Sequence, residues 1–196
     1  MPPLQHLLLF REQGADLVTF SGSKAMCGPQ ASGIILSSHA ELIEACAVND
    51  GPKTSVGRGM KVGKEKICGV VRAIELYMQR DYAADQALWE ARVARILQNL
   101  EDLAGVRAWR QFPHGLSQQI PHVAVSWKPQ DLGGRSCQDV AACLKSGNPR
   151  IACELIHEPV YAFANETGVE LCFHVHTLKD GEDETIARSL RTALED

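Results

Sequence analysis

The sequence lacks any long hydrophobic run. Its longest apolar stretches are Leu7-Leu8-Leu9-Phe10, which stops at Arg11, and Ile34-Ile35-Leu36, which stops at two serines. A membrane-spanning helix needs about 20 mostly apolar residues, so no membrane segment is predicted. Met1-Pro2-Pro3 also lacks the basic and apolar regions of a secretory signal, and a cytoplasmic location is therefore expected.

Paired cysteines and an excess of positive charge are also missing. The seven cysteines, an odd number, include no Cys-x-x-Cys pair, so neither a zinc knuckle nor a disulfide framework is indicated. Lysine and arginine total 20 against 24 acidic residues, a net charge of −4. That charge offers no overall attraction for nucleic acid or anionic lipid.

What is present is typical of a folded protein. The 196 residues are 45% hydrophobic and 22% charged, enough for one ordinary domain or two small ones. Periodicity and Gly/Pro punctuation predict strands at residues 14–22, 34–36, 106–112, 123–127, 151–156 and 169–176. They predict helices at residues 39–48, 64–80, 83–103, 140–144 and 183–194. The second half mixes both kinds of element, as in an α+β layer of sheet backed by helices.

The most informative stretch is Phe20-Ser21-Gly22-Ser23-Lys24, followed by Gly28-Pro29-Gln30 and Gly33. Its lysine comes just after a buried strand, among glycines that let backbone approach a ligand. Such a lysine can form a Schiff base or contact a phosphate. A plain Ser/Gly-rich turn is the alternative, and spacing alone favours it.

The second candidate is GRGMKVGKE, residues 57–65. If this turn is helical, Arg58, Lys61 and Lys64 share one side, where an anionic ligand could bind. The alternative is a solvated basic start of a helix. A nucleotide P-loop is excluded, because Glu65 stands where a serine or threonine would hold magnesium.

Taken together, these motifs resemble a known family. Residues 14–35 read GADLVTFSGSKAMCGPQASGII, and GRGMKVGKE follows before a helix with Ala73-Ile74-Glu75. This order of motifs resembles the pyridoxal-phosphate enzymes related to selenocysteine synthase (L-seryl-tRNA selenium transferase). The sequence looks still closer to their relative D-glucosaminate-6-phosphate ammonia-lyase. The resemblance continues through residues 144–151 and 176–178 and covers nearly the whole chain.

The resemblance implies a role for each matching residue. Lys24 falls on the lysine that forms the Schiff base with pyridoxal 5'-phosphate and then moves the substrate proton. Ser21 falls on a hydroxyl that helps to hold the cofactor phosphate, and Gly28 on a cofactor-binding loop that lies near a neighbouring subunit's active site. Arg58 and Lys61 fall where the family keeps cations for an anionic substrate group. Selenocysteine synthase has arginine where Lys61 stands, which favours the ammonia-lyase.

The resemblance also implies an α/β fold, the C-terminal half of a fold type I (aspartate-aminotransferase-like) enzyme. Residues 1–60 would be a remnant of the cofactor-binding large domain with the lysine loop. Residues 61–196 would supply long helices and an α+β small domain. In this fold the acidic partner of the pyridine nitrogen and the ring-stacking residue come from well upstream of the lysine, and only 23 residues precede Lys24. Asp16 is not expected to replace them, so this chain is expected to hold the cofactor poorly alone or not at all.

The function expected from the resemblance is a pyridoxal-phosphate lyase that eliminates from a small anionic amino acid or amino-sugar acid. One alternative is a selenium transferase acting on L-seryl-tRNA, which the acidic net charge does not favour. The other is a truncated, non-catalytic chain that contributes to a subunit interface. A homo-oligomer is expected.

A metal site is not predicted. His174 and His176 alternate along a predicted strand and so face one side, where they could bind a metal. No third ligand stands at a suggestive spacing.

Overall fold

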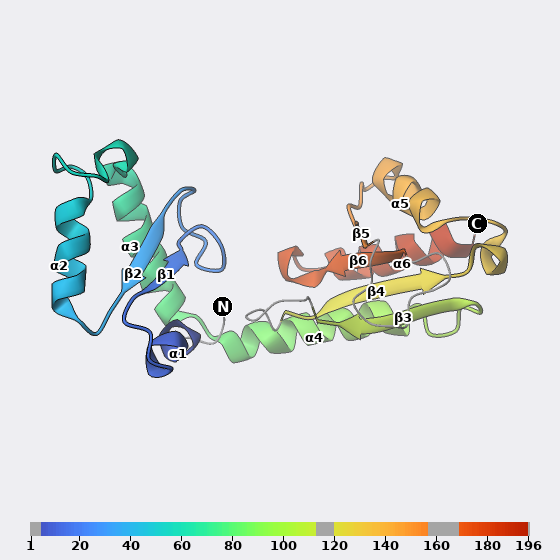
Figure 1. The fold of residues 1–196 in the computed structure, drawn as a ribbon. Coiled ribbons are helices and arrows are strands. Elements are labelled where there is room, and N and C mark those ends of the chain that lie inside the picture. Colours follow the sequence, from blue (N-terminus) through green and yellow to red (C-terminus); the bar gives the residue numbers. More distant parts are fainter. Residues whose placement is uncertain (1–4, 113–119, 157–168, 196) are drawn as a thin grey trace. The chain divides into compact units, whose positions relative to one another are not determined.

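The computed structural model describes residues 5–112, 120–156 and 169–195, which form two compact units, Met1–Tyr82 and Ala83–Asp196 (Figure 1). The division falls after Tyr82, whereas the sequence interpretation placed residues 61–82 with the second part. Helix α3 (Lys64–Gln79) belongs to the first unit because its inner face packs on the lysine loop. Among the described residues, no helix has the length and apolarity to cross a bilayer.

The first unit is a small sheet with helices. Strands β1 (Val18–Ser21) and β2 (Gly33–Leu36) pair antiparallel. They are accompanied by α1 (His6–Glu12), α2 (Ala40–Asn49), the 3-10 turn η1 (Arg58–Met60) and α3. Alternation along β1 turns Val18 and Phe20 inward, where they form a core with Met26 and Tyr77. This core is small, and it holds the lysine loop against α3.

Apolar side chains remain on the surface of this unit. Helix α2 buries none of its residues. Along α3, Ile67, Val71 and Met78 lie on one stripe and are 51%, 50% and 60% exposed. The first unit therefore keeps an apolar helix face that nothing in the described structure covers.

The second unit is a four-stranded antiparallel sheet with helices. Its strands are β3 (Val106–Gln111), β4 (His122–Trp127), β5 (Glu154–Ile156) and β6 (Glu170–His174), in the spatial order β3-β4-β6-β5. Its helices are α4 (Tyr82–Gln98), α5 (Cys137–Ser146) and α6 (Glu182–Glu195), with 3-10 turns η2 (Pro129–Leu132) and η3 (Val175–Thr177).

The core of this unit lies on one face of the sheet. Val123 and Val125 of β4 stand opposite Phe173 and Leu171 of β6, and all four are buried. They form one cluster with side chains of α4, α5 and α6. Residues of opposite parity, among them His122 and Cys172, therefore face the other side of the sheet.

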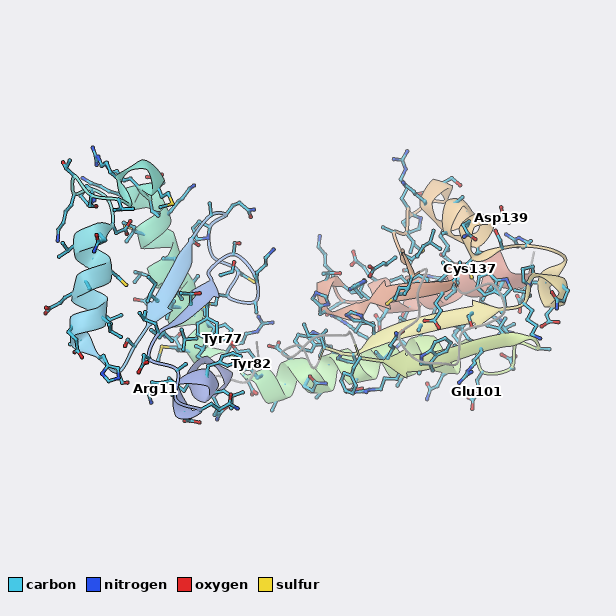
Figure 2. The ribbon with its side chains drawn as sticks, viewed as in Figure 1. Arg11, Tyr77, Tyr82, Glu101, Cys137 and Asp139 are labelled. Atoms are coloured by element: carbon cyan, nitrogen blue, oxygen red, sulfur yellow. The ribbon has the colours of Figure 1, made fainter. Side chains whose placement is uncertain are left out.

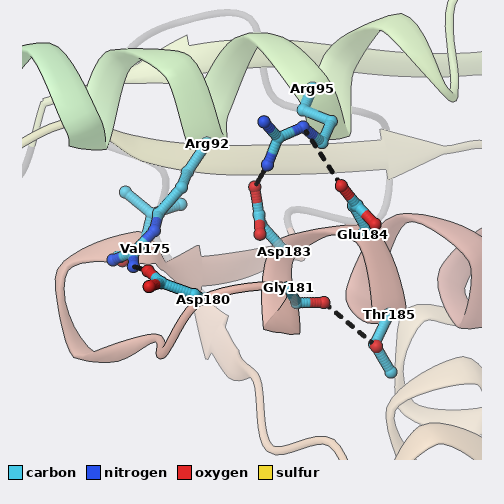
Figure 3. Close-up of polar contacts among 8 residues, drawn as sticks. All are labelled: Arg92, Arg95, Val175, Asp180, Gly181, Asp183, Glu184 and Thr185. Atoms are coloured by element: carbon cyan, nitrogen blue, oxygen red, sulfur yellow. Dashed lines mark hydrogen bonds and ion pairs between the residues drawn. The ribbon is translucent and has the colours of Figure 1, made fainter.

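Arginines of α4 hold this helix to the segment η3–α6, as Figure 3 shows. The buried Arg92 donates to the carbonyl of Val175 at 3.2 Å and to Asp180 at 3.4 Å. One turn along, Arg95 pairs with Asp183 and lies 3.9 Å from Glu184. Where α3 ends and α4 begins, the rings of Tyr77 and Tyr82 meet edge to face at 5.1 Å (Figure 2).

Most predicted elements are confirmed with shifted ends. The helix predicted at 83–103 ends at Gln98, and the strand predicted at 169–176 ends at His174, where η3 begins. Of residues 151–156, only Glu154–Ile156 form a strand. Helix α1 was not predicted, because the unbroken run Leu7-Leu8-Leu9-Phe10 shows no helical period.

Candidate functional site

Lys24 lies in the loop between β1 and β2, three residues after the end of β1. Its side chain is exposed. Within the described part of the chain, no hydrogen bond or ion pair involves its ammonium group. The amine is thus available to a ligand.

Backbone hydrogen bonds close this loop around Lys24. The N–H of Gly22 donates to the carbonyl of Ser32 at 2.9 Å, and the N–H of Gly28 donates to the carbonyl of Gly22 at 2.8 Å. A tighter turn lies inside, where the N–H of Cys27 donates to the carbonyl of Lys24 at 2.9 Å. The loop therefore holds the lysine backbone in a fixed turn rather than in a free connection.

Glycines allow this loop to pack against itself and against α3. A Cβ on Gly22 would lie 2.8 Å from the Val70 side chain, and a Cβ on Gly28 would lie 2.7 Å from the Gly22 oxygen. A Cβ on Gly69 of α3 would lie 2.5 Å from Pro29. These separations are too short for real carbon contacts. Three glycines are thus required for the close approach that positions the loop.

Two hydroxyls stand beside the lysine. Ser21 ends β1, and its Oγ lies 3.3 Å from the Oγ of Ser23. Ser21 is exposed, and a hydroxyl can both donate to and accept from a phosphate. The strand end thus presents two hydroxyls and one amine within four consecutive residues.

The two predicted substrate cations lie elsewhere in the same unit. Arg58 opens η1, and its Nη1 donates to the carbonyl of Pro52 at 2.8 Å. Lys61 follows η1, and a Cβ on Gly51 would lie 3.0 Å from its Cα. Both side chains are exposed. Among the described residues, no hydrogen bond or ion pair joins either cation to Lys24.

These residues fit one end of pyridoxal phosphate. The amine of Lys24 suits its aldehyde and the two hydroxyls suit its phosphate. Asp16 does not suit the pyridine nitrogen, because it lies at the opposite end of β1, with its carboxylate 3.3 Å from Nε2 of His39.

A second cluster contains His174, which sequence reasoning singled out, together with His122 and Cys172, which it missed. His176 lies in η3, off the strand where it was expected, whereas His122 of β4 stands directly opposite His174 of β6. The Sγ of Cys172 lies 3.7 Å from Nδ1 of His122. Burial and the nearby histidines lower the pKa of His122 to about 4, and burial raises the pKa of the Cys172 thiol to about 12. No sequence signal joined His122 and Cys172 to His174 as one site, because strand register brings His122 opposite His174.

Comparisons with known proteins find relatives that align with most of the chain. The sequence model of the L-seryl-tRNA selenium transferase family matches residues 2–137. A 5'-C-glycyluridine monooxygenase-decarboxylase from Streptomyces sp is 31% identical over 141 residues, which are 70% of this chain and 33% of that protein. A D-glucosaminate-6-phosphate ammonia lyase from Salmonella typhimurium is 29% identical over 166 residues, 80% of this chain and 40% of that protein. An L-seryl-tRNA(Sec) selenium transferase from Desulfomicrobium baculatum is 26% identical over 201 residues, 98% of this chain and 41% of that protein.

Two solved structures also match this chain. A structure of D-glucosaminate-6-phosphate ammonia-lyase matches with a TM-score of 0.63 and 26% identity, over 94% of this chain and 45% of that chain. Mouse CSAD matches with a TM-score of 0.53 and 14% identity, over 96% of this chain and 42% of that chain, and so bears on the fold alone.

The structural matches support a mixed α/β fold, and the relatives named above include a lyase and a transferase. The chain belongs to the L-seryl-tRNA selenium transferase family. It spans 33–41% of the length of the three relatives named above. The resemblance of its motifs to this family is thereby confirmed.

Proposed function

We propose that this chain is the lysine-bearing C-terminal part of a fold type I pyridoxal-phosphate lyase. In this proposal the first unit is the end of the large domain and the second unit is the small domain. The chain covers 45% of the structurally similar ammonia-lyase, which supports a partial match to a two-domain enzyme. The observation that carries the proposal is the exposed Lys24 amine, without a partner among the described residues, in a glycine-closed loop three residues after the end of β1.

The residues of the loop take separate roles. When bound, pyridoxal phosphate provides an electron sink for the negative charge that develops on the substrate's α-carbon. Lys24 would hold the cofactor's aldehyde carbon until the substrate's amine replaces it there, and the released Lys24 amine would then transfer the proton at that α-carbon, because a free amine can act as a base and its protonated form as an acid. Ser21 would donate to the phosphate. Gly28 keeps the loop closed over α3, so that the amine stays at one place.

The reaction we propose is elimination from a small anionic amino acid or amino-sugar acid. Arg58 and Lys61 would bind its carboxylate or phosphate, Arg58 through the guanidinium nitrogens that Pro52 leaves free. Lysine rather than arginine at position 61 favours this reaction over selenium transfer. The structural similarity to D-glucosaminate-6-phosphate ammonia-lyase supports the same substrate class.

Borohydride trapping tests the lysine assignment on the 196-residue chain itself. The chain is incubated with limiting pyridoxal phosphate, reduced, digested and mapped by mass spectrometry. We expect Lys24 to be labelled ahead of the other lysines, and the preferential label to disappear in Lys24→Arg but not in the matched control Lys53→Arg. Equal labelling of Lys24 and exposed Lys53 would overturn the assignment.

Ammonia release tests the reaction. The chain, and the chain supplied with the upstream part of a relative, are assayed for ammonia and keto acid from D-glucosaminate 6-phosphate and other anionic amino acids. Activity that requires Lys24 supports a lyase. If borohydride traps the cofactor on Lys24 but none of these substrates releases ammonia, the cofactor site would stand and the lyase reaction would be wrong.

Selenium transfer is the second candidate, and one observation favours it. The Desulfomicrobium baculatum transferase aligns with 98% of this chain. A transferase must bind tRNA, and such binding weakens steeply with salt because counterions are released. A gel shift with tRNA that is lost as salt rises would favour the transferase, and no shift at low salt would exclude it.

A further inference from the structure

The face of the second sheet opposite its core carries a group of metal-ligating side chains. His122 begins β4, and the strand register places it directly opposite His174 of β6. Cys172 lies two residues before His174 on the same strand and therefore on the same face. Because β4 and β6 are the two inner strands of the four, neighbours on both sides hold this arrangement in place.

The distances suit a single ion. One ligand atom from each of these three residues lies within 4.8 Å of the other two, and the Cys172 Sγ to His122 Nδ1 distance is 3.7 Å. Tetrahedral zinc, with Zn–N of about 2.0 Å and Zn–S of about 2.3 Å, places such an S and N about 3.5 Å apart. Small side-chain rotations of the two histidines, whose ring centroids are 4.1 Å apart, would complete the geometry.

A carboxylate orients one of the ligands. Nε2 of His174 lies 2.7 Å from Oε2 of Glu154 on β5, so Nδ1 is the nitrogen of His174 left for a metal. A histidine that ligates a metal commonly donates its other ring nitrogen to a carboxylate, which fixes the tautomer and the ring plane. Glu154 therefore has the position of an outer-shell partner.

The burial of these side chains and their access to solvent both suit a metal site. Cys172 and His122 are buried, while the side chain of His174 is 37% exposed, so an ion can reach the group from solvent on that side. Two imidazoles and one sulfur form a donor set that suits Zn²⁺ and not the oxygen-seeking Mg²⁺ or Ca²⁺. Three protein ligands leave a fourth coordination position open.

We propose that His122, Cys172 and His174 form a binding site for a thiophilic divalent cation such as Zn²⁺. The site is formed within the second unit and is independent of the chemistry assigned to Lys24. His176, whose ring centroid is 6.0 Å from those of both histidines, lies beside the site without being a ligand.

Cobalt titration tests the site, with Co²⁺ as the spectroscopic probe and the metal-stripped, reduced 196-residue chain as the protein. We expect binding of one equivalent, with visible bands of tetrahedral cobalt and a near-ultraviolet band from thiolate to cobalt, and displacement by Zn²⁺. Cys172→Ser should abolish the thiolate band. Glu154→Gln should keep that band and weaken binding by about 10–100-fold.

Two control variants separate this site from adventitious binding. His176→Gln removes a nearby imidazole and Cys153→Ser a nearby thiol, and neither should change the affinity or the spectrum. Circular dichroism establishes that each variant is folded. A folded wild-type chain that shows no thiolate-to-cobalt band overturns the proposal without any variant. So does a band that survives in Cys172→Ser or disappears in Cys153→Ser.

Discussion

The N–H of Gly28 donates to the carbonyl of Gly22 at 2.8 Å and thereby closes the loop that carries Lys24. The contact is so close that a Cβ on Gly28 would lie 2.7 Å from the same Gly22 oxygen and 3.3 Å from the Cβ of Ala73. The Gly22 backbone and the Ala73 side chain of α3 therefore both lie close to Gly28. Any side chain there must open the loop, and the lysine moves with it.

Gly28→Ala is therefore expected to damage the lysine site. The added methyl group should lower the free energy of unfolding by about 1–3 kcal/mol. The displaced loop should lower the preferential pyridoxal-phosphate labelling of Lys24 by about tenfold or more. Gly59→Ala is the matched control, because a Cβ on Gly59 meets nothing within 4 Å. Similar labelling of Lys24 in Gly28→Ala and wild type would show that the loop geometry does not control the amine.

A second prediction concerns the ion pair between α4 and β3. Arg110 donates through Nε and Nη2 to the two carboxylate oxygens of Glu90 at 2.8 and 2.6 Å. These hydrogen bonds hold the pKa of Glu90 below its ordinary value of 4.5. Because the folded-state pKa is the lower one, the pair stabilises the fold above pH 4.5, and this stabilisation is lost as pH falls through the lowered pKa.

Glu90→Gln should consequently lower the free energy of unfolding by about 0.5 kcal/mol at pH 7, a small value because both side chains are about one-third exposed. The difference from wild type should shrink towards zero in acid. Urea unfolding at several pH values measures it, with the exposed Glu101→Gln as a control. A difference that stays constant with pH would show that packing, and not charge, is responsible.

A third prediction concerns Arg95, which pairs with Asp183 at the start of α6. Asp183 is only 1% exposed, and its Oδ1 has no hydrogen-bond partner among the described residues. Arg95→Ala leaves this buried carboxylate without its cation, so we expect a loss of about 2 kcal/mol in the free energy of unfolding. The same substitution made in an Asp183→Ala background should cost clearly less. An equal loss of unfolding free energy in the two backgrounds would show that the apolar part of the Arg95 side chain, and not its charge, is responsible.

Local sequence signals account for the features that could be predicted, and long-range strand pairing accounts for those that could not. The loop around Lys24 follows from neighbouring residues, because a buried apolar strand, two hydroxyls and several glycines stand within one short stretch. The helix at 64–80 follows from its periodicity. By contrast, His122 and Cys172 are 50 residues apart, and only the register of β4 and β6 brings them together. Periodicity gives the face on which a residue lies but not the strand beside it.

The division of the chain shows the same limit. Helices α3 and α4 read from their sequences as two successive long helices, and the family resemblance grouped both in the part that begins at residue 61. Contacts that depend on Gly22, Gly28 and Gly69 instead attach α3 to the lysine loop. Those contacts join residues far apart in the sequence, and a pattern of apolar spacing cannot reveal them. The assignment of the two units to large and small domains stays a prediction.

The last prediction concerns the exposed stripe on α3. Ile67 and Val71 lie one helical turn apart and are each about half exposed. We expect the homo-oligomer that the family resemblance implies to bury this stripe between two copies of the chain, because burying apolar area stabilises association by about 25 cal/mol per Å². Val71→Lys should therefore shift the chain towards monomer in analytical ultracentrifugation, while Leu88→Lys, the same change at an exposed leucine of α4, should not. A wild-type chain that sediments as a folded monomer at high concentration, or equal shifts in the two variants, would remove α3 as the interface.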